Sequence, residues 1–193
     1  FKTNGEIWSS PSLDFDGTVY IGSDDQNVYA IDGLTGELKW KYKTKGKVRS
    51  SPVVGKNDFI YVSSSDRKVY AINKNTGIKV WEVDGGDAHS VAIGLDNTLY
   101  THLGAADALT GKSKWKYPDN VGAKHEGMIT SPSVDSSGNV YFIAEIEYEI
   151  QGGWKRENKF FKFGLYGEKI WEVQTEYAEW SWPAIDSNGL IYE

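Results

Sequence analysis

A sequence repeat of about 41 residues constrains the fold of this 193-residue chain more than any other feature. The segment Ser9-Ser10-Pro11 recurs as Ser50-Ser51-Pro52, and Trp40 recurs at the same offset as Trp81. Later copies are marked by Trp115, by Thr130-Ser131-Pro132 with Trp171, and by Ser181-Trp182-Pro183, after which the fifth copy is incomplete. The chain therefore contains about 4.7 copies of one structural unit.

Each copy has the pattern of four short strands. Residues 18–21 and 27–31 are β-branched and aromatic runs, and residues 37–42 alternate polar with apolar. Asp16-Gly17 and Thr35-Gly36 supply the turn residues between them. No segment shows helical periodicity with capping residues, and 21 Gly with 14% aromatic residues suit short twisted strands. The sequence predicts an all-β fold, a β-propeller of four-stranded antiparallel blades.

The repeat also predicts where the blades begin and end within a single propeller domain of residues 1–193. The expected blades span residues 7–44, 48–84, 88–118, 128–175 and, incompletely, 179–193. Residues 1–3 cannot supply the two outer strands that the fifth copy lacks, so we expect the chain to be part of a larger propeller. The open edges of such a structure are candidate association surfaces.

Composition excludes several classes of protein. The 27 Asp and Glu outnumber the 21 Lys and Arg, and the net charge of −6 argues against a nucleic-acid partner. The absence of Cys excludes disulfides, thiolate zinc sites and a Cys nucleophile. No stretch has the roughly 18 to 20 apolar residues of a transmembrane helix.

One motif in the repeat resembles a known family. Residues 30–40 (AIDGLTGELKW) are similar to the tryptophan-docking motif of quinoprotein (PQQ-type) β-propellers, Ala-x-Asp-x-x-Thr-Gly-x-x-x-Trp. Residues 71–81 and 105–115 repeat it, whereas the fourth copy keeps Gly167 and Trp171 and has Phe161 and Phe163 in place of Ala and Asp. The resemblance implies part of an eight-bladed propeller, like those of quinoprotein alcohol dehydrogenases and of the outer-membrane assembly lipoprotein.

The resemblance also implies a structural role for each motif. The tryptophan of one blade is expected to stack on the Thr-Gly turn of a neighbouring blade, because a flat ring fits against a glycine peptide. The expected docking residues are Trp40, Trp81, Trp115 and Trp171, with Gly36, Gly77, Gly111 and Gly167 in the turns.

No catalytic motif is recognisable. The sequence has no phosphate-binding glycine loop, no Gly-x-Ser-x-Gly and no His-Glu-x-x-His, and His89, His102 and His125 lack metal-pair spacing. The acidic first hairpin beginning at Asp14 recurs at Asp135 and Asp186, which favours turn chemistry over a calcium site. We predict no catalytic residue and no metal ligand.

Three functions fit these observations. The leading hypothesis is a non-catalytic binding scaffold without a cofactor, for which the resemblance favours the cell envelope or the extracellular space. The first alternative is part of a PQQ- and calcium-dependent dehydrogenase, in which Trp8 or Trp180 would stack under the cofactor. The missing Cys removes the vicinal Cys-Cys pair of the family's alcohol dehydrogenases. The second alternative is carbohydrate binding by exposed aromatic residues.

The fourth copy carries about ten extra residues between its second and third strands. Alternation around Gly152-Gly153 predicts a hairpin over residues 145–159 that turns at these glycines, with Glu149 opposite Arg156, on the face of the inter-blade loops. The candidate partner-binding residues are Tyr148, Ile150 and Trp154 on this hairpin, with His125 and Glu126 in the preceding long loop. The expected partner is a protein or a carbohydrate.

Overall fold

The structure, a computed structural model, describes residues 1–193 except 86–88, 102, 118–129, 176–183, 186–190 and 193. The regular elements of its described residues are all strands, arranged as four sheets of four strands and one of two. The prediction of an all-β fold built from four-stranded antiparallel units is therefore confirmed.

The strands follow the chain sheet by sheet. The first two sheets contain β1 (Ser12–Leu13), β2 (Thr18–Gly22), β3 (Asn27–Asp32) and β4 (Leu38–Lys43), then β5 (Val53–Val54), β6 (Phe59–Ser64), β7 (Lys68–Asn73) and β8 (Lys79–Asp84). The third and fourth contain β9 (Ala92–Ile93), β10 (Thr98–Thr101), β11 (Gly104–Asp107) and β12 (Ser113–Lys116), then β13 (Ser133–Val134), β14 (Val140–Ile150), β15 (Gly153–Phe163) and β16 (Lys169–Thr175). The last sheet pairs β17 (Ala184–Ile185) with β18 (Ile191–Tyr192).

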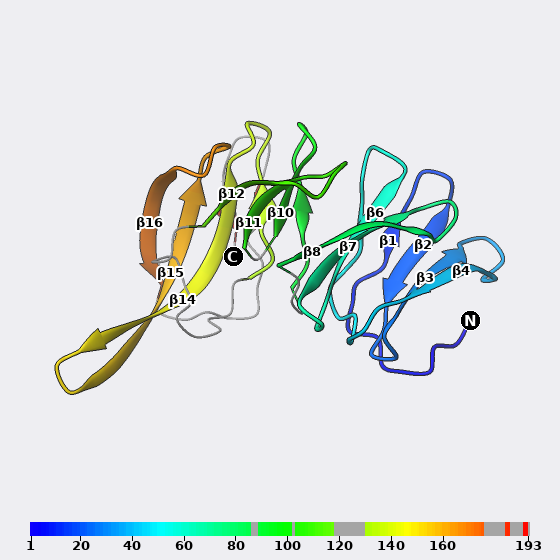
Figure 1. The fold of residues 1–193 in the computed structure, drawn as a ribbon, viewed down its shortest axis with the longest axis horizontal. Helices are drawn as coiled ribbons and strands as arrows, with labels where there is room; N and C mark the ends of the chain where they lie inside the picture. Colours follow the sequence, from blue (N-terminus) through cyan, green and yellow to red (C-terminus); the bar gives the residue numbers. More distant parts are fainter. Residues whose placement is uncertain (86–88, 102, 118–129, 176–183, 186–190, 193) are drawn as a thin grey trace.

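Every sheet is an antiparallel meander in which consecutive strands are neighbours. The sheets succeed one another across Figure 1, from β1–β4 beside the N-terminus to β13–β16. The short first strands lie beside one another, since β1 contacts β5, and β13 contacts both β9 and β17. An antiparallel meander also places each loop between the second and third strands on the same face as the connection to the next sheet.

The hydrophobic core lies between the sheets. Tyr20, Val28 and Ala30 of the first sheet are buried against Ile60 and Val62 of the second. The same arrangement recurs between the second and third sheets and between the third and fourth. Residues 60–64 of β6 are all buried, because both faces of the second sheet are covered by its neighbours.

The Ser-Ser-Pro repeat has a structural cause. The first serine of the second copy, Ser50, donates to the Ser63 carbonyl at 2.8 Å and accepts from the Ser63 amide at 2.9 Å. The second serine receives a bond from the preceding copy, as the Ser10 amide donates to Ser51 Oγ at 2.9 Å. This link continues from Ser51 to Ser90 and from Ser90 to Ser131, so one hydroxyl per sheet ties successive sheets together.

The strand register corrects one expectation about the fourth copy. Tyr20 pairs with Ala30, whereas the corresponding Tyr141 pairs with Lys162. Lys162 and Gly164 therefore occupy the places of Ala and Asp, and the correspondence expected for Phe161 and Phe163 is wrong. The turn before β16 is one residue shorter than in the first copy, which moves the alignment along β15.

Candidate functional site

Three tryptophans lie against glycine turns of the following sheet. A β-carbon added at Gly77 would lie 2.8 Å from the Trp40 ring, and Trp40 Nε1 donates to the Lys74 carbonyl at 2.8 Å. The next two contacts repeat this geometry: a β-carbon added at Gly111 would lie 2.9 Å from the Trp81 ring, and one added at Gly167 would lie 2.7 Å from the Trp115 ring. Trp81 Nε1 donates to the Leu109 carbonyl at 3.0 Å, and Trp115 Nε1 donates to the Leu165 carbonyl at 2.8 Å. Each indole thus lies on a peptide that carries no side chain.

The end members of this series differ from the middle ones. Gly36 has the same positive φ as Gly77, 74° against 71°, but no atom lies within 4 Å of a β-carbon added there. Trp171 packs against Tyr141 of its own sheet at a centroid distance of 6.0 Å, as the other three tryptophans pack against theirs, and additionally against Phe160 at 5.4 Å. That the tryptophan contacts stabilise the assembly of blades stays a prediction.

Trp8, the weak candidate for cofactor stacking, is 66% exposed. Its Nε1 donates to Glu6 Oε2 at 3.1 Å, and the Arg49 guanidinium lies 5.6 Å from the centre of its ring, within range of a cation–π interaction. Arg49 also donates twice to Asp24, at 2.8 Å and 2.7 Å, and thereby holds the pKa of that carboxyl well below its ordinary value. The Trp8 ring therefore has a cation as its neighbour.

Several candidates lie outside the described residues, namely Trp180, His102, His125 and Glu126. His89 is half-buried directly before Ser90, which belongs to the chain of serine hydrogen bonds. Among the described residues, no group of three or more His, Asp or Glu side chains is placed to hold a metal ion. Nor does the described part contain a helix long and apolar enough to cross a membrane.

The acidic residues of the first hairpins bond to their own turns. The Thr18 amide donates to Asp16 Oδ1 at 2.9 Å, and the Thr98 amide donates to Asp96 Oδ1 at 3.0 Å. The bond from the Thr18 amide is the largest cause that lowers the pKa of Asp16. These carboxylates act as the acceptors of turns that begin strands.

The extra residues of the fourth copy extend its second and third strands into a hairpin. β14 and β15 have 11 residues each, but β16 pairs with β15 only from Asn158 onward. Residues 146–150 and 153–157 are therefore paired only with each other among the described strands. We name residues 146–157 the arm, and Figure 1 shows it projecting beyond the four sheets.

The register of the arm differs from the expected one by one turn position. Ile150 pairs with Gly153, so the turn residues are Gln151 and Gly152, and Arg156 lies opposite Glu147 rather than Glu149. The reason lies in the turn, because only its second residue has a positive φ, 102° at Gly152. One glycine therefore suffices, and Gly153 begins β15.

The arm is anchored at its base and apolar at its tip. Ile146 packs against the core between the third and fourth sheets. At the tip, Ile150 is 45% and Trp154 54% exposed. Strand alternation places these two side chains on opposite faces of the ribbon, because Trp154 pairs with Glu149, the residue beside Ile150.

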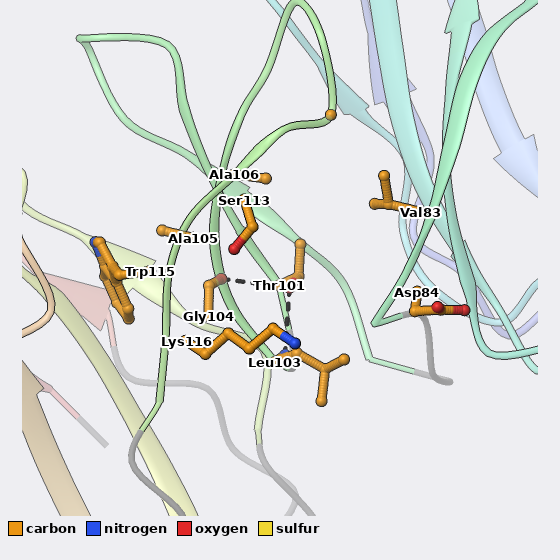
Figure 2. Close-up of a pocket in the computed structure, with 11 residues that line it drawn as sticks. Val83, Asp84, Thr101, Leu103, Gly104, Ala105, Ala106, Ser113, Trp115 and Lys116 are labelled. Atoms are coloured by element: carbon orange, nitrogen blue, oxygen red, sulfur yellow. Dashed lines mark hydrogen bonds between the residues drawn. The ribbon is translucent and has the colours of Figure 1, made fainter.

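Sequence reasoning missed a pocket of about 200 Å³ between the second and third sheets (Figure 2). Val83 and Asp84, at the end of β8, form one wall. The opposite wall comes from the third sheet, chiefly Thr101, Leu103, Gly104, Ala106, Ser113 and Lys116. The one signal that could have revealed it is the small size of Val83 and Gly104, because the first and third copies carry a tyrosine at the place of Val83 and every other complete copy carries a ring at the place of Gly104.

Four-stranded antiparallel sheets placed side by side by their first strands define a partial β-propeller. The quinoprotein-type repeat expected from the docking motif is confirmed by comparison with known proteins. Residues 3–162 match the family described as outer membrane protein assembly factor BamB, and the chain belongs to that family. A comparison with curated proteins gave no match.

Three solved structures share the fold. BamB from Moraxella catarrhalis is 16% identical, with a TM-score of 0.59 over 90% of this chain and 63% of that chain. The computationally designed Ika8 protein is 13% identical, with a TM-score of 0.62 over 84% and 48%. Quinohemoprotein alcohol dehydrogenase from Comamonas testosteroni is 15% identical, with a TM-score of 0.57 over 97% and 45%. The chain thus spans less than two thirds of the length of each.

Proposed function

We propose that this chain is a non-catalytic binding scaffold whose arm contacts a protein partner at the cell envelope. The observation that carries the proposal is the exposure of Ile150 and Trp154 on a ribbon that extends past every neighbouring described strand. The family description, outer membrane protein assembly factor, supports a partner among the proteins that assemble outer-membrane proteins.

The physical chemistry of the arm favours a partner. A two-stranded ribbon is marginally stable alone in water. Packing of another protein surface against the arm would therefore stabilise it. Tryptophan and arginine, the types that contribute most to protein interfaces, both occur on β15 as Trp154 and Arg156. Arg156 Nη1 lies 3.6 Å from Glu145 Oε1, and Lys155 Nζ lies 2.8 Å from Glu157 Oε1, so both cations form ion pairs with glutamates at the base of the arm.

The backbone of the arm supports a protein rather than a carbohydrate. Within residues 146–157, neither outer edge of the ribbon is paired with a further described strand. Such edges offer amide and carbonyl groups to an incoming strand, while alternate side chains provide specificity. The antiparallel meander places the arm on the face that carries the connections between sheets, and a partner would approach there.

Photo-crosslinking from the arm tests this proposal. Trp154 is replaced by the photo-crosslinking residue p-benzoylphenylalanine in the full-length natural protein, which is expressed in cells of the organism that naturally produces it. The cells are irradiated, and the crosslinked proteins are identified by mass spectrometry. The control places the same residue at Tyr166, which is 83% exposed in the turn at the opposite end of the same sheet. We expect a defined protein crosslink from position 154 that Ile150→Lys abolishes. A pattern identical to that from position 166, or unaffected by Ile150→Lys, would contradict the role of the arm.

A second measurement tests the non-catalytic part of the proposal. PQQ with Ca²⁺ is titrated into the full-length protein and followed by absorbance, with an alcohol and an electron acceptor added afterwards. We expect neither saturable binding nor turnover. Stoichiometric binding accompanied by dehydrogenase activity would replace the scaffold by the enzyme alternative.

A further inference from the structure

Neighbouring sheets meet through aromatic rings at one recurrent place. Tyr42, two residues after Trp40, packs against Tyr70 of the next sheet with ring centres 5.7 Å apart. Phe1 with Tyr29 at 5.1 Å is the corresponding contact in the first copy. Tyr117, at the place of Tyr42, packs at 4.6 Å against Phe142, which stacks on Phe161, the counterpart of Tyr70. The Tyr42 and Tyr117 contacts lie between two sheets, whereas Phe1 belongs to the segment before the first strand and covers the open side of the first sheet.

The contact between the second and third sheets lacks both rings. Val83 follows Trp81 by two residues and so holds the place of Tyr42. Gly104 pairs with Thr101 as Tyr70 pairs with Val62, so glycine holds the place of the second ring. Both residues line the pocket of about 200 Å³, which is the space that the two rings fill elsewhere.

The backbone prevents the third sheet from filling this space itself. Gly104 has φ 139°, and a β-carbon there would lie 2.4 Å from the Trp115 carbonyl oxygen. A side chain at Gly104 is therefore excluded by main-chain atoms that cannot easily move. Ala106, which pairs with Leu99 as Ile72 pairs with Ile60, is also smaller than its counterpart.

Polar groups border the apolar wall. Figure 2 shows the Lys116 side chain extending toward the side of the pocket where Thr101 and Leu103 lie. Asp84 stands at the other wall and binds Lys68 Nζ at 2.7 Å. An ammonium group can donate to a phenol oxygen and can also lie over an aromatic face. The tyrosines of the first two sheets likewise bond to charged groups, as Tyr70 Oη donates to Asp66 Oδ2 at 2.7 Å.

We propose that the pocket between β8 and β10–β12 binds one phenol ring, supplied by a tyrosine side chain of a partner polypeptide. The size fits a single ring, since an apolar cavity of about 150 Å³ accommodates benzene. The polypeptide source follows from the first two copies, where aromatic rings of the chain itself fill the corresponding space. The inference concerns a different surface from the arm and does not depend on it.

The site is tested by titrating p-cresol, an analogue of the tyrosine side chain, into the ¹⁵N-labelled protein and following the backbone amides by NMR. We expect saturable shifts of the backbone amides of Thr101, Gly104 and Ser113. Toluene should bind about tenfold more weakly, because it lacks the oxygen that Lys116 would bond. Lys116→Met should reduce this preference to about one. Absence of saturable shifts, or equal affinity for the two compounds, would overturn the proposal.

Two variants test whether p-cresol binds in this pocket, and a competition experiment tests whether a tyrosine within a polypeptide backbone can occupy it. Val83→Tyr restores the ring found at Tyr42 and should abolish p-cresol binding, whereas Val80→Tyr, on an exposed position of the same strand, should not. If Val83→Tyr does not fold, Ala106→Ile fills the pocket with a smaller added side chain and should likewise block p-cresol binding. N-acetyl-tyrosinamide should compete with p-cresol. Binding of p-cresol that survives both fillings, or that N-acetyl-tyrosinamide cannot displace, would contradict the site or its polypeptide source.

Discussion

Replacing Gly77 by alanine would place a methyl group where the Trp40 ring lies. The added β-carbon would be 2.8 Å from ring atom Cδ2, closer than carbon atoms approach without displacement. Gly36 is at the same turn position of the first sheet, with φ 74° against 71°, yet has no atom within 4 Å of such a carbon. The two substitutions therefore share one backbone cost, and only Gly77→Ala also displaces a ring.

The expected magnitudes differ accordingly. A left-handed conformation costs a non-glycine residue about 1–2 kcal/mol, which is the expected loss for Gly36→Ala. Displacing Trp40 also breaks its bond to the Lys74 carbonyl, worth about 1 kcal/mol, and removes part of its packing. Complete loss of a buried tryptophan costs about 3–5 kcal/mol, and Trp40 is only half-buried. We therefore expect Gly77→Ala to lower the free energy of unfolding by about 3–4 kcal/mol.

Urea unfolding followed by circular dichroism measures both variants. The decisive control is the Trp40→Ala background, in which Gly77→Ala should cost no more than Gly36→Ala, because no ring remains to be displaced. Equal costs for the two glycine substitutions in the otherwise unchanged protein would refute the reasoning. So would a Gly77→Ala cost that stays the same after Trp40 has been removed.

Three further predictions concern stability. Ser50→Ala should lower the free energy of unfolding, measured in urea, by about 1–3 kcal/mol, because it leaves the buried Ser63 amide without its acceptor. Ser50→Thr should cost much less, because Thr130 accepts the equivalent bond in the fourth sheet. Equal losses for the two variants would count against this role of Ser50. Arg49 lowers the pKa of Asp24, so their contact stabilises the fold above the ordinary aspartate pKa and is lost as pH falls through the depressed one. Asp24→Asn should therefore lower Tm at pH 7 more than near pH 2, and a loss independent of pH would contradict this. Replacing residues 147–156 by a two-residue turn should change Tm by no more than about 2–4 °C, corresponding to about 1 kcal/mol, because this part of the arm lies beyond the core. A larger loss would show that the arm stabilises the fold itself.

Local chemistry allowed much of the fold to be predicted from the sequence. The alternation of β2 and β3 and the turn residues between them act over a few positions, so each repeat indicates its own strands. The motif that contains Gly77 predicted both a ring on the turn and a residue without a side chain beneath it. The structure places Trp40 there, 2.8 Å from the β-carbon position.

The arm shows where local reasoning stops. The run Gln151-Gly152-Gly153 is compatible with more than one two-residue turn, and the sequence does not state which pair has the required backbone angles. Pairing of β14 with β15 selects Gln151 and Gly152, because Ile150 then lies opposite Gly153. The same pairing, rather than the spacing of motifs, places Lys162 where other copies have Ala.

The pocket was decided by the tertiary structure alone. By themselves, Val83 and Gly104 are ordinary departures from a repeat, and they lie in different copies. Only the packing of β8 against the third sheet makes them two walls of one space. The physical reason is that the repeat determines only which side chains each sheet directs toward the neighbouring sheets. Whether two small residues leave a pocket depends on the backbone that holds them apart, here the fixed path of Gly104 beside the Trp115 carbonyl.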